Sequence, residues 1–145
     1  MKTLTFETTI NAPRARVWDT MLKLDTYQAW TAAFCEGSTY EGSWDKGARI
    51  RFGTPSGHGT IAIIAENQLH TYVSIQHIGM IDKGVEDTTS DKVKAMTPAF
   101  ENYRFTDTPQ GTLLTVTMDT IPDYEQYMHD TYPKALALLK ELCER

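Results

Sequence analysis

The order of the predicted elements indicates an α+β fold, in which a curved antiparallel β-sheet wraps around a long C-terminal helix. Two observations carry this prediction. Short segments with strand-like alternation recur between residues 37 and 119, and an apolar stripe with helical spacing runs along residues 123–144. One antiparallel sheet with helices packed on one of its faces belongs to the α+β class.

The first strand and a pair of short helices are expected in the N-terminal segment. Residues 3–10 are rich in threonine and alternate apolar with polar side chains, which is typical of a strand. Residues 11–22 have Pro13 at a favoured first-turn position and an apolar face that includes Trp18, which indicates a helix. A second short helix or turn around residues 25–30 then leads into the sheet.

Six further strands are predicted after the helices. The glycine-rich residues 53–59 connect two of them and lack the Gly-Lys-Ser/Thr end of a phosphate-binding loop. Residues 82–96 are too hydrophilic and unpatterned for a core element, so a solvated loop is expected there. The six strands cover residues 37–44, 48–53, 60–66, 69–78, 100–107 and 112–119.

The long C-terminal helix is predicted over residues 123–144. Pro133 lies inside it, removes a backbone hydrogen bond and predicts a kink near residues 129–133. The residues that recur at near-helical spacing and form one apolar stripe are Tyr124, Met128, Thr131, Ala135, Leu139 and Leu142.

Length, charge and cysteine content restrict the class of protein. A chain of 145 residues fits a single domain, 1–145, which buries roughly 70% of its unfolded surface and needs no disulfide or metal. The net charge of −5 argues against nucleic acid and anionic membrane surfaces. No signal peptide or membrane-spanning segment is recognisable, so we expect a soluble, cytoplasmic protein without membrane insertion.

The sequence also resembles a known superfamily. The segments that carry the resemblance are residues 10–18, Trp30 to Phe34, Tyr40 to Trp44, residues 74–93, residues 100–105 and residues 132–140. Together they resemble the SRPBCC (START-like) superfamily, and within it the bacterial branch related to the C-terminal domain of the activator of heat-shock-protein-ninety ATPase. The resemblance implies a helix-grip fold, in which the sheet and the C-terminal helix enclose a cavity. Relatives bind lipids, sterols, polyketides or plant hormones, and some catalyse cyclisation or hydrolysis.

Polar residues on the predicted inward faces are the candidates for chemistry. His77 shares a strand face with Ile75, and is either a hydrogen-bonded core histidine or a polar anchor in an apolar pocket. Glu101 and Tyr103 share a face of the next strand with Phe105. If that face is inward, we expect desolvation to raise the pKa of Glu101, which could then act as an acid or base.

The other histidines and the cysteines are predicted to have no chemical role. His58 and His70 are expected to face solvent, and His129 forms a surface pair with Glu125 rather than part of a metal site. Two cysteines are too few for a disulfide framework or a zinc site. Cys35 is expected to be a buried or half-buried inert thiol near the cavity entrance.

Binding of a small hydrophobic or aromatic molecule in the cavity is the predicted function, with no catalytic residue, metal or cofactor. The alternatives are a cyclase- or hydratase-type enzyme that uses cavity acid–base residues, and a co-chaperone-like protein-binding module. A protein partner and the oligomeric state stay open, as does the choice between core and pocket wall for the aromatic residues near the entrance. The side chains expected around the cavity are Tyr27, Trp30, Phe34, Phe52, Ile75, His77, Glu101, Tyr103, Phe105, Met118, Met128 and Tyr132.

Overall fold

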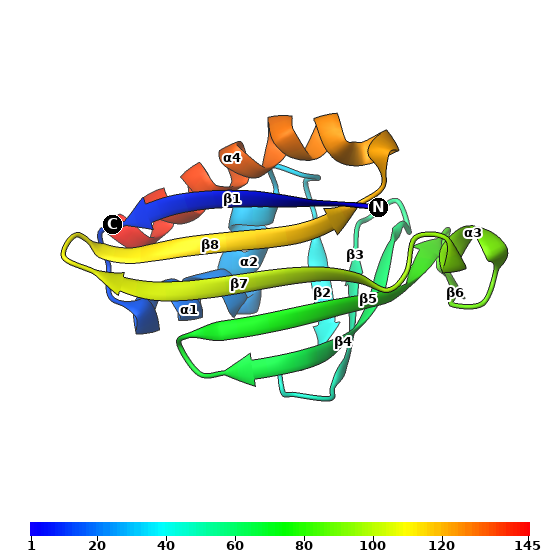
Figure 1. Cartoon of the computed structure of the whole chain (residues 1–145), viewed down its shortest axis with the longest axis horizontal. Coiled ribbons are helices and arrows are strands. Elements are labelled where there is room, and N and C mark those ends of the chain that lie inside the picture. The colour runs from blue at the N-terminus through cyan, green and yellow to red at the C-terminus, as the bar shows by residue number, and fades with distance from the viewer.

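A strongly curved antiparallel sheet is the largest layer of the molecule, and the computed structural model describes all of residues 1–145 (Figure 1). Seven strands follow the order β1-β8-β7-β5-β4-β3-β2, and β6 pairs only with β5. The strands are β1 (Lys2–Ile10), β2 (Thr39–Gly42), β3 (Arg49–Gly53), β4 (Gly59–Gln68), β5 (Tyr72–Asp82), β6 (Val85–Asp87), β7 (Ala99–Thr108) and β8 (Gly111–Thr120).

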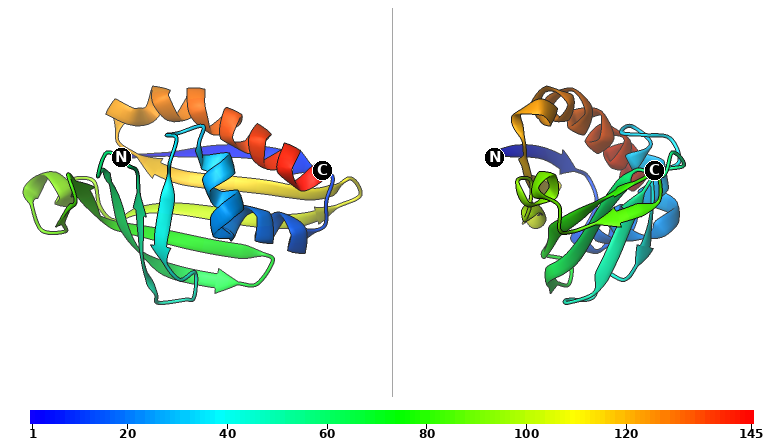
Figure 2. Two further views of the ribbon diagram at one scale, coloured as in Figure 1. Left: turned by 180° about the vertical axis from the view of Figure 1, so that it is seen from behind. Right: turned by 90° about the vertical axis from the view of Figure 1, so that its right-hand side faces the viewer.

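Three helices, α1 (Arg14–Leu22), α2 (Leu24–Thr31) and α4 (Pro122–Glu144), cover the concave side of the sheet (Figure 2). The long helix α4 runs beside β1, and the N-terminus of the chain lies near its first turn (Figure 1). The fourth helix, α3 (Asp91–Lys94), is a single turn between β6 and β7. None of the helices combines the length and apolarity that are needed to cross a membrane.

The predicted fold class is confirmed. The sheet is antiparallel and curved, two short helices follow the first strand, and a long helix ends the chain. Pro13 precedes the first residue of α1 as its N-cap and therefore lies one position earlier than expected.

The segment predicted as a solvated loop, residues 82–96, is instead partly structured. It contains β6 and α3, and its Val93 side chain is buried. Strand β6 can pair with β5 because Gly79 has no side chain, since a Cβ there would lie 2.7 Å from the carbonyl oxygen of Asp87. Two short elements that pack on a neighbouring strand need little hydrophobic pattern of their own, which is why the polar composition was misleading.

The core fills one end of the space between sheet and helices. There Trp18 of α1 packs against Phe105 of β7 at 5.2 Å between ring centroids. Helix α4 continues without a break through Pro133, whose ring faces solvent. The predicted stripe is correct only for the C-terminal half of α4, because Tyr124 is 49% exposed. The buried residues of α4 are Thr131, Tyr132, Ala135, Leu136, Leu139 and Cys143.

Candidate ligand-binding cavity

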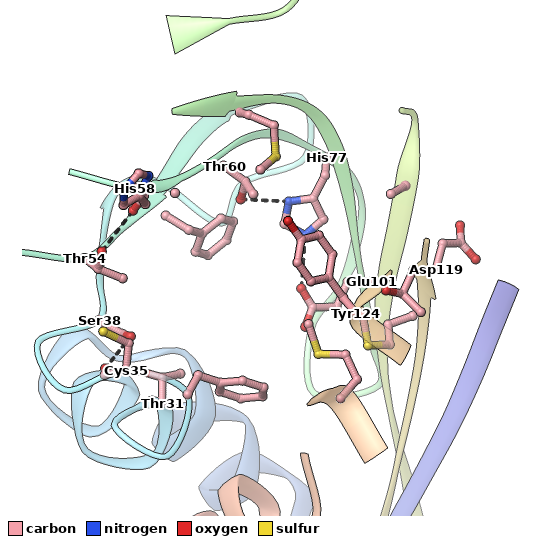
Figure 3. Close-up of a pocket in the computed structure, with 18 of the residues that line it drawn as sticks. Thr31, Cys35, Ser38, Thr54, His58, Thr60, His77, Glu101, Asp119 and Tyr124 are labelled. Atoms are coloured by element: carbon pink, nitrogen blue, oxygen red, sulfur yellow. Dashed lines mark hydrogen bonds and ion pairs between the residues drawn. The ribbon is translucent and has the colours of Figure 1, made fainter. Parts of the chain in front are cut away.

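The other end of the same space is a cavity of about 480 Å³, bounded by the sheet, α2 and the N-terminal half of α4 (Figure 3). Ile75 and Phe105 do not line it, because both are buried within the core. The other ten residues predicted for the cavity do line it: Tyr27, Trp30, Phe34, Phe52, His77, Glu101, Tyr103, Met118, Met128 and Tyr132.

A polar network stands in one wall of the cavity, and Glu101 is at its centre. The Glu101 Oε1 atom lies 3.1 Å from His77 Nε2, and Oε2 accepts a hydrogen bond of 3.2 Å from the Tyr103 hydroxyl. The Tyr132 hydroxyl of α4 also donates to Oε2. On its other side, His77 Nδ1 lies 3.0 Å from Thr60 Oγ1 (Figure 3).

Strand register brings these residues together. Glu101 and Tyr103 are two residues apart on β7, so both side chains point to the concave face. His77 of β5 pairs with Ala99, which places its ring next to Glu101 on the same face. Thr60 comes from β4 and Tyr132 from the middle of α4, so four elements supply the network.

The charge state of Glu101 differs from the prediction. Removal from water would raise the pKa of Glu101, but the hydrogen bonds from His77, Tyr132 and Tyr103 and the charge of His77 hold it below its usual value. The raised pKa predicted from desolvation alone is therefore wrong, because the donors around the carboxylate could not be counted from the sequence. Burial and the nearby Glu101 charge raise the pKa of the Tyr103 and Tyr132 hydroxyls, so both stay protonated.

Aromatic side chains from α2 and β3 form a further part of the wall. Tyr27 lies 5.6 Å from Trp30 and 6.1 Å from Phe52 between ring centroids. The Trp30 indole donates to the Met21 carbonyl at 3.0 Å, which fixes α2 against the end of α1. Trp30 is thus both a core residue and part of the cavity wall, so the two alternatives for this ring are compatible.

The Tyr27 hydroxyl differs from the polar groups of the network around Glu101, because it has no hydrogen-bond partner in the protein. The Tyr27 side chain is buried, and no hydrogen bond of its hydroxyl to another protein group is present, although it lines the cavity. Burial, followed by the charge of Glu101 and the neighbouring Tyr40, raises the pKa of Tyr27 far above its usual range. Tyr27 therefore presents a neutral hydroxyl to the cavity.

The mouth of the cavity is lined by exposed residues from both ends of the chain. Met1, Tyr124 and Tyr127 are exposed there, and the Tyr127 hydroxyl donates to the Phe34 carbonyl at 2.8 Å. Cys35 lines the mouth and is exposed, so the prediction of a buried or half-buried thiol is wrong. It lies in the connection between α2 and β2.

The remaining histidines lie near the surface. His58 is 59% exposed, lines the cavity mouth and contacts Asp82 at 3.1 Å. His70 is half-buried rather than solvent-facing, because its ring meets the edge of Trp18 at 6.0 Å. His129 pairs with Glu125 at 3.5 Å, as a surface contact.

Sequence reasoning missed several residues of the cavity. Thr60 completes the His77 contact, but one threonine in a strand carries no distinguishing signal. Met96 follows α3 in the segment predicted as a solvated loop, and Met80 lies beyond the predicted end of its strand. The clustering of methionines in segments that lack a clear core pattern was the available signal.

The sequence profile of the family described as Activator of Hsp90 ATPase homolog 1-like protein matches residues 11–144. The chain belongs to this family. The resemblance noted from the sequence is thereby confirmed, although no protein of curated function matches the chain.

Solved structures with low sequence identity share the fold of this Hsp90-ATPase-activator-like chain. Protein MLL2253 from Mesorhizobium loti is 14% identical, with a TM-score of 0.74 over 97% of this chain and 96% of that one. The Aha1 dimer from Colwellia psychrerythraea is 15% identical, with a TM-score of 0.73 over 99% and 97%. CalU16 from Micromonospora echinospora is 14% identical, with a TM-score of 0.67 over 97% and 75%.

Proposed function

We propose that this family member binds a small hydrophobic or aromatic molecule in the cavity between the sheet and α4. The supporting observation is a space of about 480 Å³ whose lining includes eight aromatic and five methionine side chains, together with threonine hydroxyls and the polar network around Glu101. Ligand sites typically have volumes of 300–1,000 Å³ and combine apolar walls with polar groups that fix the ligand.

The Tyr27 hydroxyl adds a second argument. The hydroxyl has no hydrogen-bond partner in the protein, and it opens to the cavity rather than being sealed in the core. It is therefore free to bind an oxygen or nitrogen atom of a molecule in the cavity.

The test uses a neutral, environment-sensitive dye, N-phenyl-1-naphthylamine. We expect the dye to bind and to quench tryptophan fluorescence, because Trp30 lines the cavity. Ala99→Phe places a ring in the cavity and should abolish binding, whereas Thr106→Phe, on the exposed face of the same strand, should not. Equal dye affinity in the two variants would refute the proposal, and native mass spectrometry of the purified protein would identify a retained ligand.

An acid–base enzyme of the cyclase or hydratase type is the second candidate. The contact between His77 and Glu101 favours it, because a carboxylate that orients an imidazole is a common arrangement of a general base. Both ring nitrogens of His77 are occupied, however, so a substrate would have to displace Thr60 from Nδ1. The decisive measurement is whether an identified ligand changes mass on incubation with the protein, and whether His77→Gln stops that change.

A protein-binding module receives less support. Such a surface needs a contiguous exposed apolar patch. Leu69 and Val85 are exposed but lie beyond opposite ends of β5, which spans roughly 35 Å over its 11 residues. The exposed apolar residues that do gather, Met1, Tyr124 and Tyr127, belong to the mouth of the cavity.

A further inference from the structure

The charged groups around the cavity have an unusual composition. No lysine or arginine lines it, and its acidic residues are Glu101 and Asp119. The Asp119 carboxylate points away from the cavity, because it accepts hydrogen bonds from Thr3 and from the Phe100 backbone (Figure 3). Glu101 is therefore the carboxylate that faces inward. The lining histidines are His58 and His77, and each lies against a carboxylate, Asp82 for His58 and Glu101 for His77.

The hydrogen-bond directions in the polar network also restrict which ligand groups can bind. Tyr103 and Tyr132 use their protons to bind Glu101, so their oxygens offer only lone pairs to the cavity. His77 Nε2 is paired with Glu101 and Nδ1 with Thr60, so neither ring nitrogen is left to donate to a ligand. Glu101 itself only accepts. The network as a whole thus presents acceptors to whatever enters the cavity.

From this arrangement we infer that the cavity selects molecules whose polar group is a hydrogen-bond donor, such as an alcohol, a phenol or an amine, and that it rejects carboxylates. The inference rests on the proposed function and defines its ligand class. A ligand hydroxyl can donate to the network and accept from Tyr27 at the same time. An ammonium group gains the inward charge of Glu101 and the faces of the surrounding aromatic rings.

A carboxylate meets the opposite situation. It has no proton to give to the acceptors of the network, and it would lie against Glu101 in a medium of low dielectric constant. The first turn of α4 could in principle attract an anion at the mouth, but Asp123 and Glu125 already occupy that turn. The Tyr27 hydroxyl can donate one hydrogen bond to a carboxylate, but no lysine or arginine of the lining compensates the negative charge.

The test compares three probes that share one ring system: 2-naphthalenemethanol, 2-naphthylmethylamine and 2-naphthoate. Their head groups are neutral, cationic and anionic at pH 7.5, and isothermal titration calorimetry measures their affinities for the full chain. We expect the alcohol and the amine each to bind at least about tenfold more tightly than the acid. An acid that binds as tightly as either of them would overturn the inference while leaving ligand binding intact. Failure of all three probes to bind would overturn the proposed function itself.

Glu101→Gln tests the residue that carries the selection. Removal of the charge should reduce the discrimination against 2-naphthoate by about fivefold or more. Glu141→Gln, the same change at an exposed residue that pairs with Arg145, should leave the ratio unchanged. An unchanged ratio in Glu101→Gln would contradict the role of this carboxylate. Should that variant fail to fold by circular dichroism, the comparison of the three probes on the unaltered chain still decides the inference.

Discussion

The two halves of helix α4 face the same sheet but meet it in different ways. In the C-terminal half, Ala135, Leu139 and Cys143 are buried, and α1 packs beside them. In the N-terminal half, Tyr124 and Met128 border an open cavity instead. Helix α2 borders the cavity, whereas α1 lies only at the closed end, so the difference teaches that the position of α1 decides where this fold encloses a core and where it leaves a binding space.

The side chains of the two halves match these roles. The closed half uses short aliphatic groups that fill space at high density. The open half uses tyrosines, which keep a polar tip beside an apolar ring, and methionine, which adapts to irregular shapes. We therefore expect substitutions in the closed half to change stability and substitutions in the open half to change binding.

The largest expected effect is that of Leu139→Ala in the closed half. Leu139 is fully buried, so the truncation should leave a void and lower the free energy of unfolding by about 2–5 kcal/mol. Urea denaturation measures this loss. The affinity for a neutral dye should stay within about twofold when it is measured well below the unfolding transition. A loss of stability below about 1 kcal/mol would show that the closed half is not tightly packed.

Pro133→Ala acts at the junction of the two halves and should give the next largest effect. Alanine restores the backbone N–H that proline lacks in this continuous helix, and the site is exposed, so no packing is lost. The free energy of unfolding should rise by up to about 3 kcal/mol, measured by thermal melting. We further expect weaker dye binding, because proline favours a bend in a helix, and loss of that tendency would bring the N-terminal half of α4 closer to the sheet and narrow the cavity. Lower stability with unchanged binding would contradict this role of Pro133.

The two halves of α4 also show which parts of the fold and of the cavity can be predicted from the sequence alone. The alternation of residues 112–119 and the long helix identify the fold because a period in the sequence translates directly into a face of an element. The same reasoning placed Tyr132 and Met128 at the cavity. It failed for Tyr124, since a helical stripe does not reveal where the neighbouring layer ends.

The polar network was harder to predict than the apolar wall. That Glu101 and Tyr103 share a face follows from strand periodicity, and so does the inward position of His77. The number of hydrogen-bond donors to the Glu101 carboxylate does not follow from strand periodicity, because one of them, Tyr132, lies on a helix 31 residues further along the chain. The direction of a pKa shift depends on that number, so desolvation alone gave the wrong sign.

The third prediction concerns acid stability and uses Glu101→Gln. The pKa of Glu101 lies below its ordinary value of 4.5 in the folded protein, so its ionised form stabilises the fold above that value. This contribution is lost as the pH falls through the lowered pKa. Melting curves between pH 7 and pH 3 should therefore show a smaller acid-induced loss in the variant than in the unaltered chain.

The comparison isolates Glu101, because Glu125 and Glu144, whose pKa values are also lowered by their hydrogen bonds, are present in both proteins. At neutral pH the variant should be less stable by about 1–3 kcal/mol, since the amide leaves one of the donors without an acceptor. Parallel pH profiles for the two proteins would mean that the carboxylate is not held by its three donors in solution.

The smallest expected effect is that of Met128→Ala in the open half, one of the counterparts to Leu139→Ala. Met128 is half-buried and borders a space that already opens to solvent, so truncation enlarges that space without creating a closed void. Alanine also has a slightly higher helix propensity than methionine, which offsets part of the lost contact. The free energy of unfolding should fall by less than about 1 kcal/mol in urea denaturation, while the dye affinity changes by more than it does in Leu139→Ala. A loss of stability as large as that of Leu139→Ala would show that the open half closes on itself in solution, and the distinction between the two halves of α4 would then be lost.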